Sequence, residues 1–154
     1  MRLIPKNLMM LWVLAVLCCL PTTAWAETFA VVTAIAEPDA RGRWRPVQTT
    51  PAAAKLEGET RTPLVVGMAL DLGEQVVTDE ARVTIRLGKR EHITVSPAAA
   101  ITIQERSVIQ RMGEVYYQVR DIFSVQYGTV QTAVEGTEFA ISGSESGVGV
   151  AVTD

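Results

Sequence analysis

The sequence predicts an all-β domain of short strands, either a sandwich or a small β-solenoid-like stack, that follows a cleaved signal peptide. From Leu64 onward, apolar and polar residues alternate in short runs, which is the pattern of half-buried strands. The centres of these runs fall about every 8–10 residues, and turn-forming glycine, proline and aspartate separate them. Regular short strands of this kind indicate a sandwich, a barrel or a solenoid. The lack of a strict repeat argues against a long, regular β-helix.

The N-terminal segment has the three parts of a secretory signal peptide. Arg2 and Lys6 carry the only charges before Glu27, and an apolar run extends from Leu8 to Leu20. Ala24-Trp25-Ala26 then offers small residues at the two positions that a signal peptidase requires. A membrane-spanning helix needs about 20 apolar residues, and this run is shorter. We therefore expect Sec-type export with cleavage after Ala26, and a periplasmic or secreted protein.

Cleavage would change the composition of the remaining chain, residues 27–154. Cys18 and Cys19 would leave with the signal peptide, and neither follows the small residue that a lipoprotein signal needs. The remaining chain would then have no disulfide and no thiolate metal site. Its 12 basic and 17 acidic side chains give a net charge of −5, which disfavours nucleic acid and anionic membranes as partners. Its length suits one domain, and we expect no stable membrane anchor after cleavage.

The first expected elements are a strand and a hairpin arm that contains a tryptophan. Phe29–Ala36 is short and rich in β-branched residues, which predicts a strand, and Glu37–Gly42 predicts a turn. Alternation then places Trp44 on one side of the chain and a row of arginines on the other. We expect Trp44 to be buried, and the arginine row to be a solvated strand face in preference to a polyanion site. The arginines are Arg41, Arg43 and Arg45.

The segment from Thr49 to Pro63 differs from its surroundings in composition. It contains two prolines, a glycine and scattered charges, which predict an exposed loop around 49–63. One helical turn is expected at Ala52–Leu56. Loops of this length in compact domains are often mobile or functional. We therefore expect a specific contact with a partner to be found in this segment before any other.

Beyond Leu64 the apolar residues form a series of inward-facing rows. The clearest row lies in 81–87, where polar residues alternate without a fault with Ala81, Val83, Ile85 and Leu87. Further short rows are expected at 93–95, 101–103, 108–109, 115–119, 123–125, 130–134, 139–141 and 148–152.

The most distinctive stretch is Phe123–Ile141 (FSVQYGTVQTAVEGTEFAI), which contains two alternating runs, a glycine break and Gly136-Thr137-Glu138-Phe139. That order resembles the end of the FecR-domain signature, V-x-G-T-x-F. Leu70–Thr78 resembles the family's L-x-x-G-D-x-V-x-T element, with Glu74 in place of aspartate, and Gly113-Glu114-Val115 resembles its G-x-V element. We expect a structural role for the residues that carry the resemblance, which are Gly73, Thr78, Gly113, Phe123, Val125, Gly136, Thr137 and Phe139.

The resemblance implies a small β-solenoid-like stack in an exported domain with a role in sensing or regulation. Family members that regulate iron uptake combine this domain with a cytoplasmic anti-sigma region and a membrane helix. We find neither in the sequence and expect a stand-alone domain that acts through a separate membrane protein. The family usually continues into another strand, so the strand at 148–152 is expected at an edge. This edge is either unpaired, as a template for strand addition, or blunted by Gly149 and Thr153-Asp154.

No set of residues forms a recognisable catalytic, metal-binding or cofactor-binding motif. His92 is the only histidine, and alternation places it on the strand face opposite Ile93 and Val95, where we expect it to be exposed. Single carboxylates lie near turns without the spacing of a calcium or zinc site. These are Glu91, Glu105, Glu114 and Glu135. We therefore expect no enzyme activity, no cofactor and no metal.

Two functions from different classes fit these expectations. The first is an exported, non-enzymatic module that binds an envelope protein, a peptide or a glycan in sensing or regulation. The second is a structural or assembly component of the cell envelope that associates with itself through its C-terminal edge strand. The state of association separates the two, because only the second requires oligomers of this chain.

Overall fold

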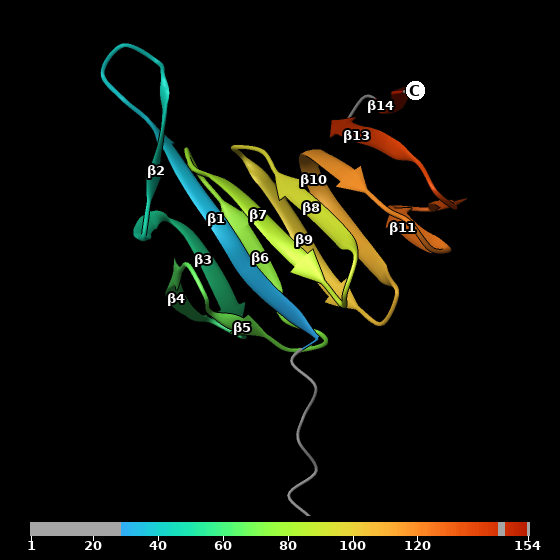
Figure 1. Cartoon of the computed structure of the whole chain (residues 1–154), viewed down its shortest axis with the longest axis horizontal. Coiled ribbons are helices and arrows are strands. Elements are labelled where there is room, and N and C mark those ends of the chain that lie inside the picture. The colour runs from blue at the N-terminus through green and yellow to red at the C-terminus, as the bar shows by residue number, and fades with distance from the viewer. Residues whose placement is uncertain (1–28, 145–146, 154) are drawn as a thin grey trace, which may run out of the picture.

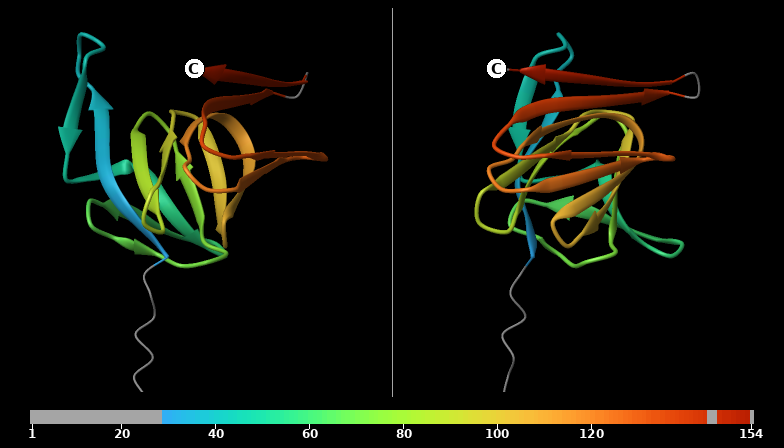
Figure 2. Two further views of the ribbon diagram at one scale, coloured as in Figure 1. Left: turned by 45° about the vertical axis from the view of Figure 1, so that its right-hand side comes forward. Right: turned by 90° about the vertical axis from the view of Figure 1, so that its right-hand side faces the viewer.

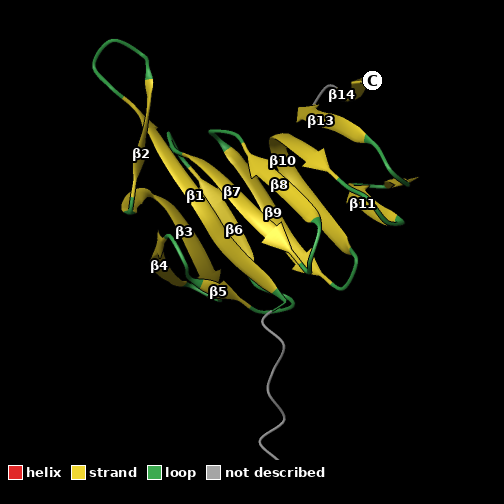
Figure 3. Ribbon diagram, viewed as in Figure 1, coloured by secondary structure: helices red, strands yellow, loops and turns green. Residues whose placement is uncertain are grey.

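The computed structural model describes residues 29–144 and 147–153 (Figure 1). The predicted signal peptide and its cleavage site at Ala26 lie outside these residues. Every regular element in the described part of the chain is a strand and none is a helix (Figure 3), so the all-β prediction is confirmed. Among the same residues, no helical segment has the length and hydropathy needed to cross a membrane.

The described residues form 14 strands, which Figure 1 labels in chain order. The first seven are β1 (Ala30–Pro38), β2 (Trp44–Val47), β3 (Thr49–Glu57), β4 (Thr60–Val65), β5 (Ala69–Leu70), β6 (Gln75–Thr78) and β7 (Arg82–Leu87). The last seven are β8 (Glu91–Val95), β9 (Ala99–Gln104), β10 (Ser107–Gln118), β11 (Phe123–Tyr127), β12 (Val130–Val134), β13 (Glu138–Ser144) and β14 (Gly147–Thr153). From β7 onward the strands lie where alternation predicts them, except that the two short rows at 108–109 and 115–119 join into one strand, β10.

The strands join into one sheet that curls around a single core. The order of neighbours is β2-β1-β7-β8-β10-β9-β6-β3-β4, with the β11–β12 and β13–β14 hairpins attached to β10. Figure 2 shows that the sheet curls into a half-barrel. After β4 the chain returns to β1, where the amide of Val32 donates to the carbonyl of Met68 at 3.0 Å and the amide of Gly67 donates to the carbonyl of Val32 at 2.8 Å. These bonds tie the connection between β4 and β5 to β1.

Strand β10 belongs to both faces of the curled sheet. Its first half, Ser107–Met112, pairs with β9 and, in parallel orientation, with β11. Its second half, Gly113–Gln118, pairs with β13 and, from Val115 onward, with β8. The change of partners occurs at Gly113, whose φ of +80° lies in the left-handed region that favours glycine. A strand that changes sheets at a bend makes the corner between two packed faces.

The core consists of the inward-facing residues of both faces. Alternation is a reliable guide to these positions, since the row in β7 is buried at Val83, Ile85 and Leu87. In β1 a bulge between Val32 and Ala34 shifts the alternation, and Ile35 is buried in place of Ala34. One bulge therefore suffices to change which residues of a strand reach the core.

Residues 49–63, predicted to form an exposed loop with one helical turn, instead form most of the β3–β4 hairpin, and that prediction was wrong. Strand β3 pairs with β6 through Ala53–Leu56 and also pairs with β4. A register shift between Thr50 and Ala54 accommodates Pro51, which cannot donate a backbone hydrogen bond. The fully buried side chains of this hairpin are Thr50, Ala53, Ala54 and Leu64. Local composition favours a loop here. The segment forms a strand instead because it pairs with β6 and buries small side chains in the core.

The prediction that Trp44 is buried was also wrong. Trp44 is 38% exposed in the edge strand β2, and the guanidinium carbon of Arg82 lies 4.4 Å from the centroid of its ring. In the register of β1 and β2, Val47 lies opposite Ile35, whose side chain is in the core. Alternation from Val47 places Trp44 on the outer face of the sheet. The indole therefore packs on a cation at the surface instead of entering the core.

The arginine row beside Trp44 is solvated, as predicted, and one carboxylate orders it. Arg43 and Arg45 each lie 3.1 Å from Asp39, which also accepts hydrogen bonds from the backbone amides of Arg41 and Arg43. The hydrogen bond from the Arg43 amide is the main reason that the pKa of Asp39 is lowered, although desolvation opposes it. Two of the three arginines are therefore already paired.

Candidate functional site

Four strands of more than two residues pair with a single neighbour in the described part of the chain, namely β2, β4, β12 and β14. The edges of β2 and β4 are protected, because each strand contains an arginine and a proline and both residues discourage further pairing. Strands β12 (VQTAV) and β14 (GVGVAVT) contain neither a charge nor a proline. Their edges are therefore open to the addition of another strand.

Strand β14 carries an apolar row that continues the face of the core without a cover. Its register with β13 places Val152 opposite Phe139 and Val150 opposite Ile141. Residues directly opposite one another in a sheet share a face, and Phe139 and Ile141 are buried in the core. The valines on the same face are nevertheless exposed, with fractions of 37% at Val148, 48% at Val150 and 60% at Val152.

Strand β12 repeats this arrangement on the other face of the curled sheet. Val134 lies opposite the buried Phe123, and Val130, which is 45% exposed, lies opposite Tyr127. The β11–β12 and β13–β14 hairpins leave the two halves of β10 and project at the same end of the molecule (Figures 1 and 2). We call their uncovered inner surfaces the open face, which consists of Val130, Val148, Val150 and Val152.

The two hairpins of the open face meet where the ring of Tyr127 lies against the backbone of β13. A Cβ atom on Gly143 would lie 1.9 Å from Cζ of Tyr127, so only glycine leaves room for the ring in this position. The half-buried Tyr127, the last residue of β11, thus packs against β13 near the turn ends of both hairpins.

A buried polar network fixes the second hairpin to β10. The side-chain amide of Gln110, which is completely buried, donates to the carbonyls of Gly113 at 2.8 Å and of Ile141 at 2.9 Å. Its oxygen accepts a hydrogen bond of 2.9 Å from the hydroxyl of Tyr117. Burial raises the pKa of that hydroxyl, which therefore stays protonated as a donor. Sequence reasoning missed Gln110, and its signal was a polar residue in an inward position two residues after Val108.

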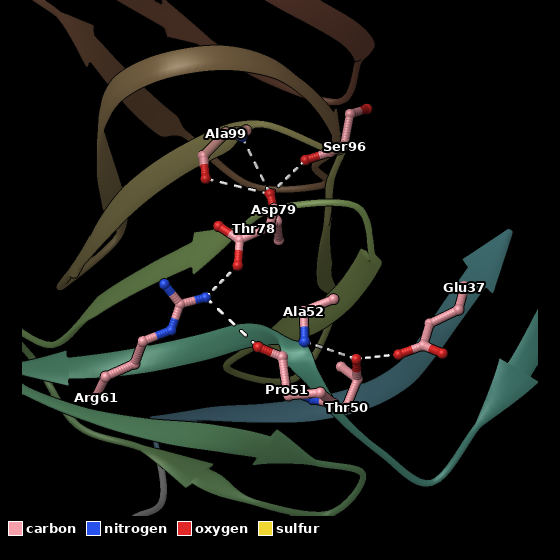
Figure 4. Close-up of polar contacts among 9 residues, drawn as sticks. All are labelled: Glu37, Thr50, Pro51, Ala52, Arg61, Thr78, Asp79, Ser96 and Ala99. Atoms are coloured by element: carbon pink, nitrogen blue, oxygen red, sulfur yellow. Dashed lines mark hydrogen bonds and ion pairs between the residues drawn. The ribbon is translucent and has the colours of Figure 1, made fainter.

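Two of the predicted structural residues, Gly73 and Thr78, hold β6 to β9 and to the turn between β8 and β9. The hydroxyl of Thr78 lies 2.6 Å from the carbonyl oxygen of Ser96 and accepts a hydrogen bond of 3.1 Å from the amide of Ala99 (Figure 4). The amide of Gly73, whose φ is +88°, donates to the carbonyl of Ile103 at 2.7 Å. Both residues act on the backbone, which is a structural role.

Glu74, which stands where the FecR signature has aspartate, is only 8% exposed. Its carboxylate accepts a hydrogen bond of 2.9 Å from the amide of Asp71 and forms an ion pair with Lys55. Burial raises the pKa of Glu74, but the bonds from Lys55 and from the Asp71 amide outweigh this effect, and the pKa is lowered overall. The longer side chain of glutamate thus joins β3 to the turn before β6.

The remaining predicted residues lie in the core or at the corner that precedes β13. Phe139 stacks on Tyr117 with ring centroids 4.9 Å apart. The carbonyl of Thr137 accepts a hydrogen bond of 3.1 Å from the amide of Val119, and the preceding Gly136 has a φ of +61°. Phe123 and Val125 are buried, and Gly113 lies at the bend of β10.

His92 lies on the outer face of the sheet, between Arg86 of β7 and Gln118 of β10. The predicted face is therefore correct, but the side chain is half-buried instead of exposed. The four single carboxylates lie apart from one another on β8, the β9–β10 turn, β10 and the β12–β13 turn, at Glu91, Glu105, Glu114 and Glu135. In the part of the chain that the structure describes, no three histidine, cysteine, aspartate or glutamate residues are grouped so as to hold a metal ion.

Comparisons with models of protein families, with curated proteins and with solved structures gave no match. The FecR resemblance therefore rests on the residues named above.

Proposed function

We propose that the protein is an exported domain of the FecR type that binds an extended segment of an envelope protein at the open face and has no enzymatic activity. The carrying observation is the exposed valine row of β14, which continues the face of the core past its last buried residues. The outer edge of β14 also presents backbone N–H and C=O groups that no strand of the described chain pairs. An added strand satisfies both needs, because it supplies hydrogen bonds to the edge and apolar cover to the valines.

The chemistry of the edge selects the kind of segment that binds. Main-chain hydrogen bonds provide affinity, and every second side chain of the added strand packs on the open face. A segment with apolar residues at alternate positions suits Val150 and Val152, whereas a charged residue at such a position would be desolvated without a partner. The N-terminal sequence pattern supports export.

A second candidate is an assembly component that associates with itself, and the symmetry of β14 favours it. If two copies of β14 pair in antiparallel orientation around Val150, then Val148 of one copy lies opposite Val152 of the other. The strand contains no charge, so this pairing brings no like charges together. The two copies would also form one continuous apolar row.

Site-specific photo-crosslinking in intact cells tests both candidates. A photoreactive amino acid replaces Val152, and the crosslinked products are compared with and without the substitution Val150→Lys. The matched control is Val65→Lys on β4, because Val65 is 42% exposed but lies in a protected edge strand. Light scattering of the purified protein measures its mass in parallel.

Each result has a defined meaning. A crosslink to another envelope protein that Val150→Lys abolishes and Val65→Lys preserves supports strand binding. A crosslink between two copies, with a doubled mass in solution, supports self-association and rejects the first candidate. A monomer without a crosslink, or one whose crosslinks survive Val150→Lys, contradicts both candidates.

A further inference from the structure

A cavity of about 360 Å³ lies where the β7–β8 turn meets the connection between β10 and β11. Its apolar walls come from Phe29, Leu87, Ile122 and Phe123. Leu87 and Phe123 are 2% exposed and close the inner side, whereas Ile122 is 66% exposed and borders the mouth. The volume is within the range of about 300–1,000 Å³ that is usual for small-molecule sites. An isoleucine this exposed beside a cavity provides an apolar wall that the chain itself does not cover.

The mouth of this cavity is cationic. Lys89, Arg90 and Arg106 line it, and Arg90 also lines a neighbouring cavity of about 320 Å³ together with His92, Gln118 and Arg120. The two adjoining cavities, which we call the basic cleft, thus contain four cationic side chains. They contain only two carboxylates, Glu91 and Asp121.

Three of the four cations of the basic cleft differ from most others in the molecule in having no internal partner, whereas the fourth, Arg120, interacts electrostatically with Glu138 and helps to lower the pKa of that carboxyl. Arg43 and Arg45 pair with Asp39, Lys55 pairs with Glu74, and Arg61 pairs with Asp79. Among the described residues, the side chains of Lys89, Arg90 and Arg106 form no ion pair and no hydrogen bond. A chain with more acidic than basic residues therefore leaves a group of cations unpaired beside an apolar cavity, where they attract anions.

We propose that the basic cleft binds a monomeric amphipathic anion, such as an alkyl carboxylate or an alkyl phosphate. The apolar chain lies against Phe29 and Ile122 in the larger cavity, and the anionic group lies beside Arg90 and Arg120. Arginine suits this role because its planar guanidinium donates two parallel hydrogen bonds to a carboxylate or a phosphate. This site does not include the open face and goes beyond the proposed function, so the two can be tested separately.

Calorimetric titration of the purified protein tests the ligand class with four probes. Octyl phosphate and octanoate, both below their micelle concentrations, carry the chain and an anionic group. Inorganic phosphate carries only the anion, and octyl glucoside carries only the chain. A charge-assisted hydrogen bond stabilises binding by about 1.5–3 kcal/mol, so one octyl anion should bind at least about tenfold more tightly than octyl glucoside.

The comparison of the probes can overturn the proposal. Equal affinity for octyl glucoside rejects the anion site, and equal affinity for inorganic phosphate rejects the apolar site. The absence of binding by both octyl anions rejects the proposal altogether. The stronger of the two octyl anions identifies the head group as a phosphate or a carboxylate.

Matched variants locate the site. Arg90→Ala and Ile122→Asp are expected to weaken binding of the preferred octyl anion at least about tenfold. Arg90→Ala removes a cation that contacts the anionic group, and Ile122→Asp removes an apolar wall that contacts the alkyl chain. The controls are Arg41→Ala, an exposed arginine outside the cleft, and Leu72→Asp, at a leucine that is 51% exposed. If the controls weaken binding as much as their counterparts, the assignment to the basic cleft is wrong.

Two further measurements separate this site from the others. Amide NMR spectra show whether each variant is folded, and Ile122→Asp is expected to be tolerated because its side chain is already largely in water. Val150→Lys, which tests the open face, is expected to leave binding of the octyl anion unchanged. Loss of octyl-anion binding in a folded Val150→Lys protein would contradict the location of the site.

Discussion

Replacement of Gly113 by alanine is expected to destabilise the fold strongly, because a side chain there meets backbone at the bend of β10. A Cβ atom on Gly113 would lie 2.6 Å from the carbonyl oxygen of Ala98 and from the Cα of Ala99, and 2.5 Å from the Cβ of Ala99. These atoms cannot move easily, because hydrogen bonds hold both residues. The amide of Ala98 donates to the carbonyl of Asp79 at 2.8 Å, and the amide of Ala99 donates to the hydroxyl of Thr78. Relief of the contact requires movement of β9 or β10.

The expected magnitude combines two effects. A non-glycine residue in the left-handed region costs about 1–2 kcal/mol. Insertion of a methyl group into a packed site costs about 1–3 kcal/mol more. The free energy of unfolding should therefore fall by about 2–5 kcal/mol, a large part of the 5–15 kcal/mol that is typical of a whole domain.

Urea unfolding followed by far-ultraviolet circular dichroism measures this loss, and Gly136→Ala is its matched control. Gly136 has a φ of +61°, and no heavy atom lies within 4 Å of a Cβ built on it. This control therefore experiences only the conformational effect of about 1–2 kcal/mol. The difference between the two variants isolates the contact with Ala98 and Ala99.

Equal losses of unfolding free energy in Gly113→Ala and Gly136→Ala would refute the reasoning. Such a result would mean that β9 and β10 separate at little cost, and that the bend does not depend on close approach. The comparison is valid only if both variants keep the m-value of the parent protein, because a changed m-value indicates a changed native or denatured state.

Two further predictions concern buried polar groups. Gln110→Leu leaves the Tyr117 hydroxyl without its acceptor and removes the side-chain hydrogen bonds to two carbonyls. Urea unfolding should therefore show a loss of about 2–4 kcal/mol, whereas Tyr117→Phe should lose about 1–2 kcal/mol; the reverse order would contradict the network. The lowered pKa of Glu74 means that its contribution to stability is present above its ordinary pKa of 4.5 and is lost as the pH falls through the lowered folded value. Glu74→Gln should therefore reduce the fall of Tm on acidification, with the contributions of Asp39 and Glu138 remaining, and an unchanged profile in calorimetry would contradict it.

The candidate site was only partly predictable from the sequence. Alternation at 148–152 predicts a strand, and the FecR resemblance suggested that it lies at an edge. The equivalent role of β12 was missed, because its sequence VQTAV has the same local pattern as a strand paired on both sides. The basic cleft was also missed, since it unites Phe29, Arg90, Arg106 and Ile122 from four separate parts of the chain.

By itself the sequence determined the all-β class and most strand positions, because alternation is a local property and each inward row of β7, β8 and β11 needs only its own residues. The tertiary structure alone decided the features that depend on neighbouring strands, which are strand pairing and the burial or exposure of side chains. Residues 49–63 became a hairpin because β6 and the core cover Ala53 and Ala54. Trp44 faces outward because the register of β2 with β1 places Val47, and not Trp44, on the face of the buried Ile35. The open face has the same origin, since the exposure of Val150 depends on whether another strand lies beyond β14. Which side of a strand stays uncovered is a property of the whole sheet.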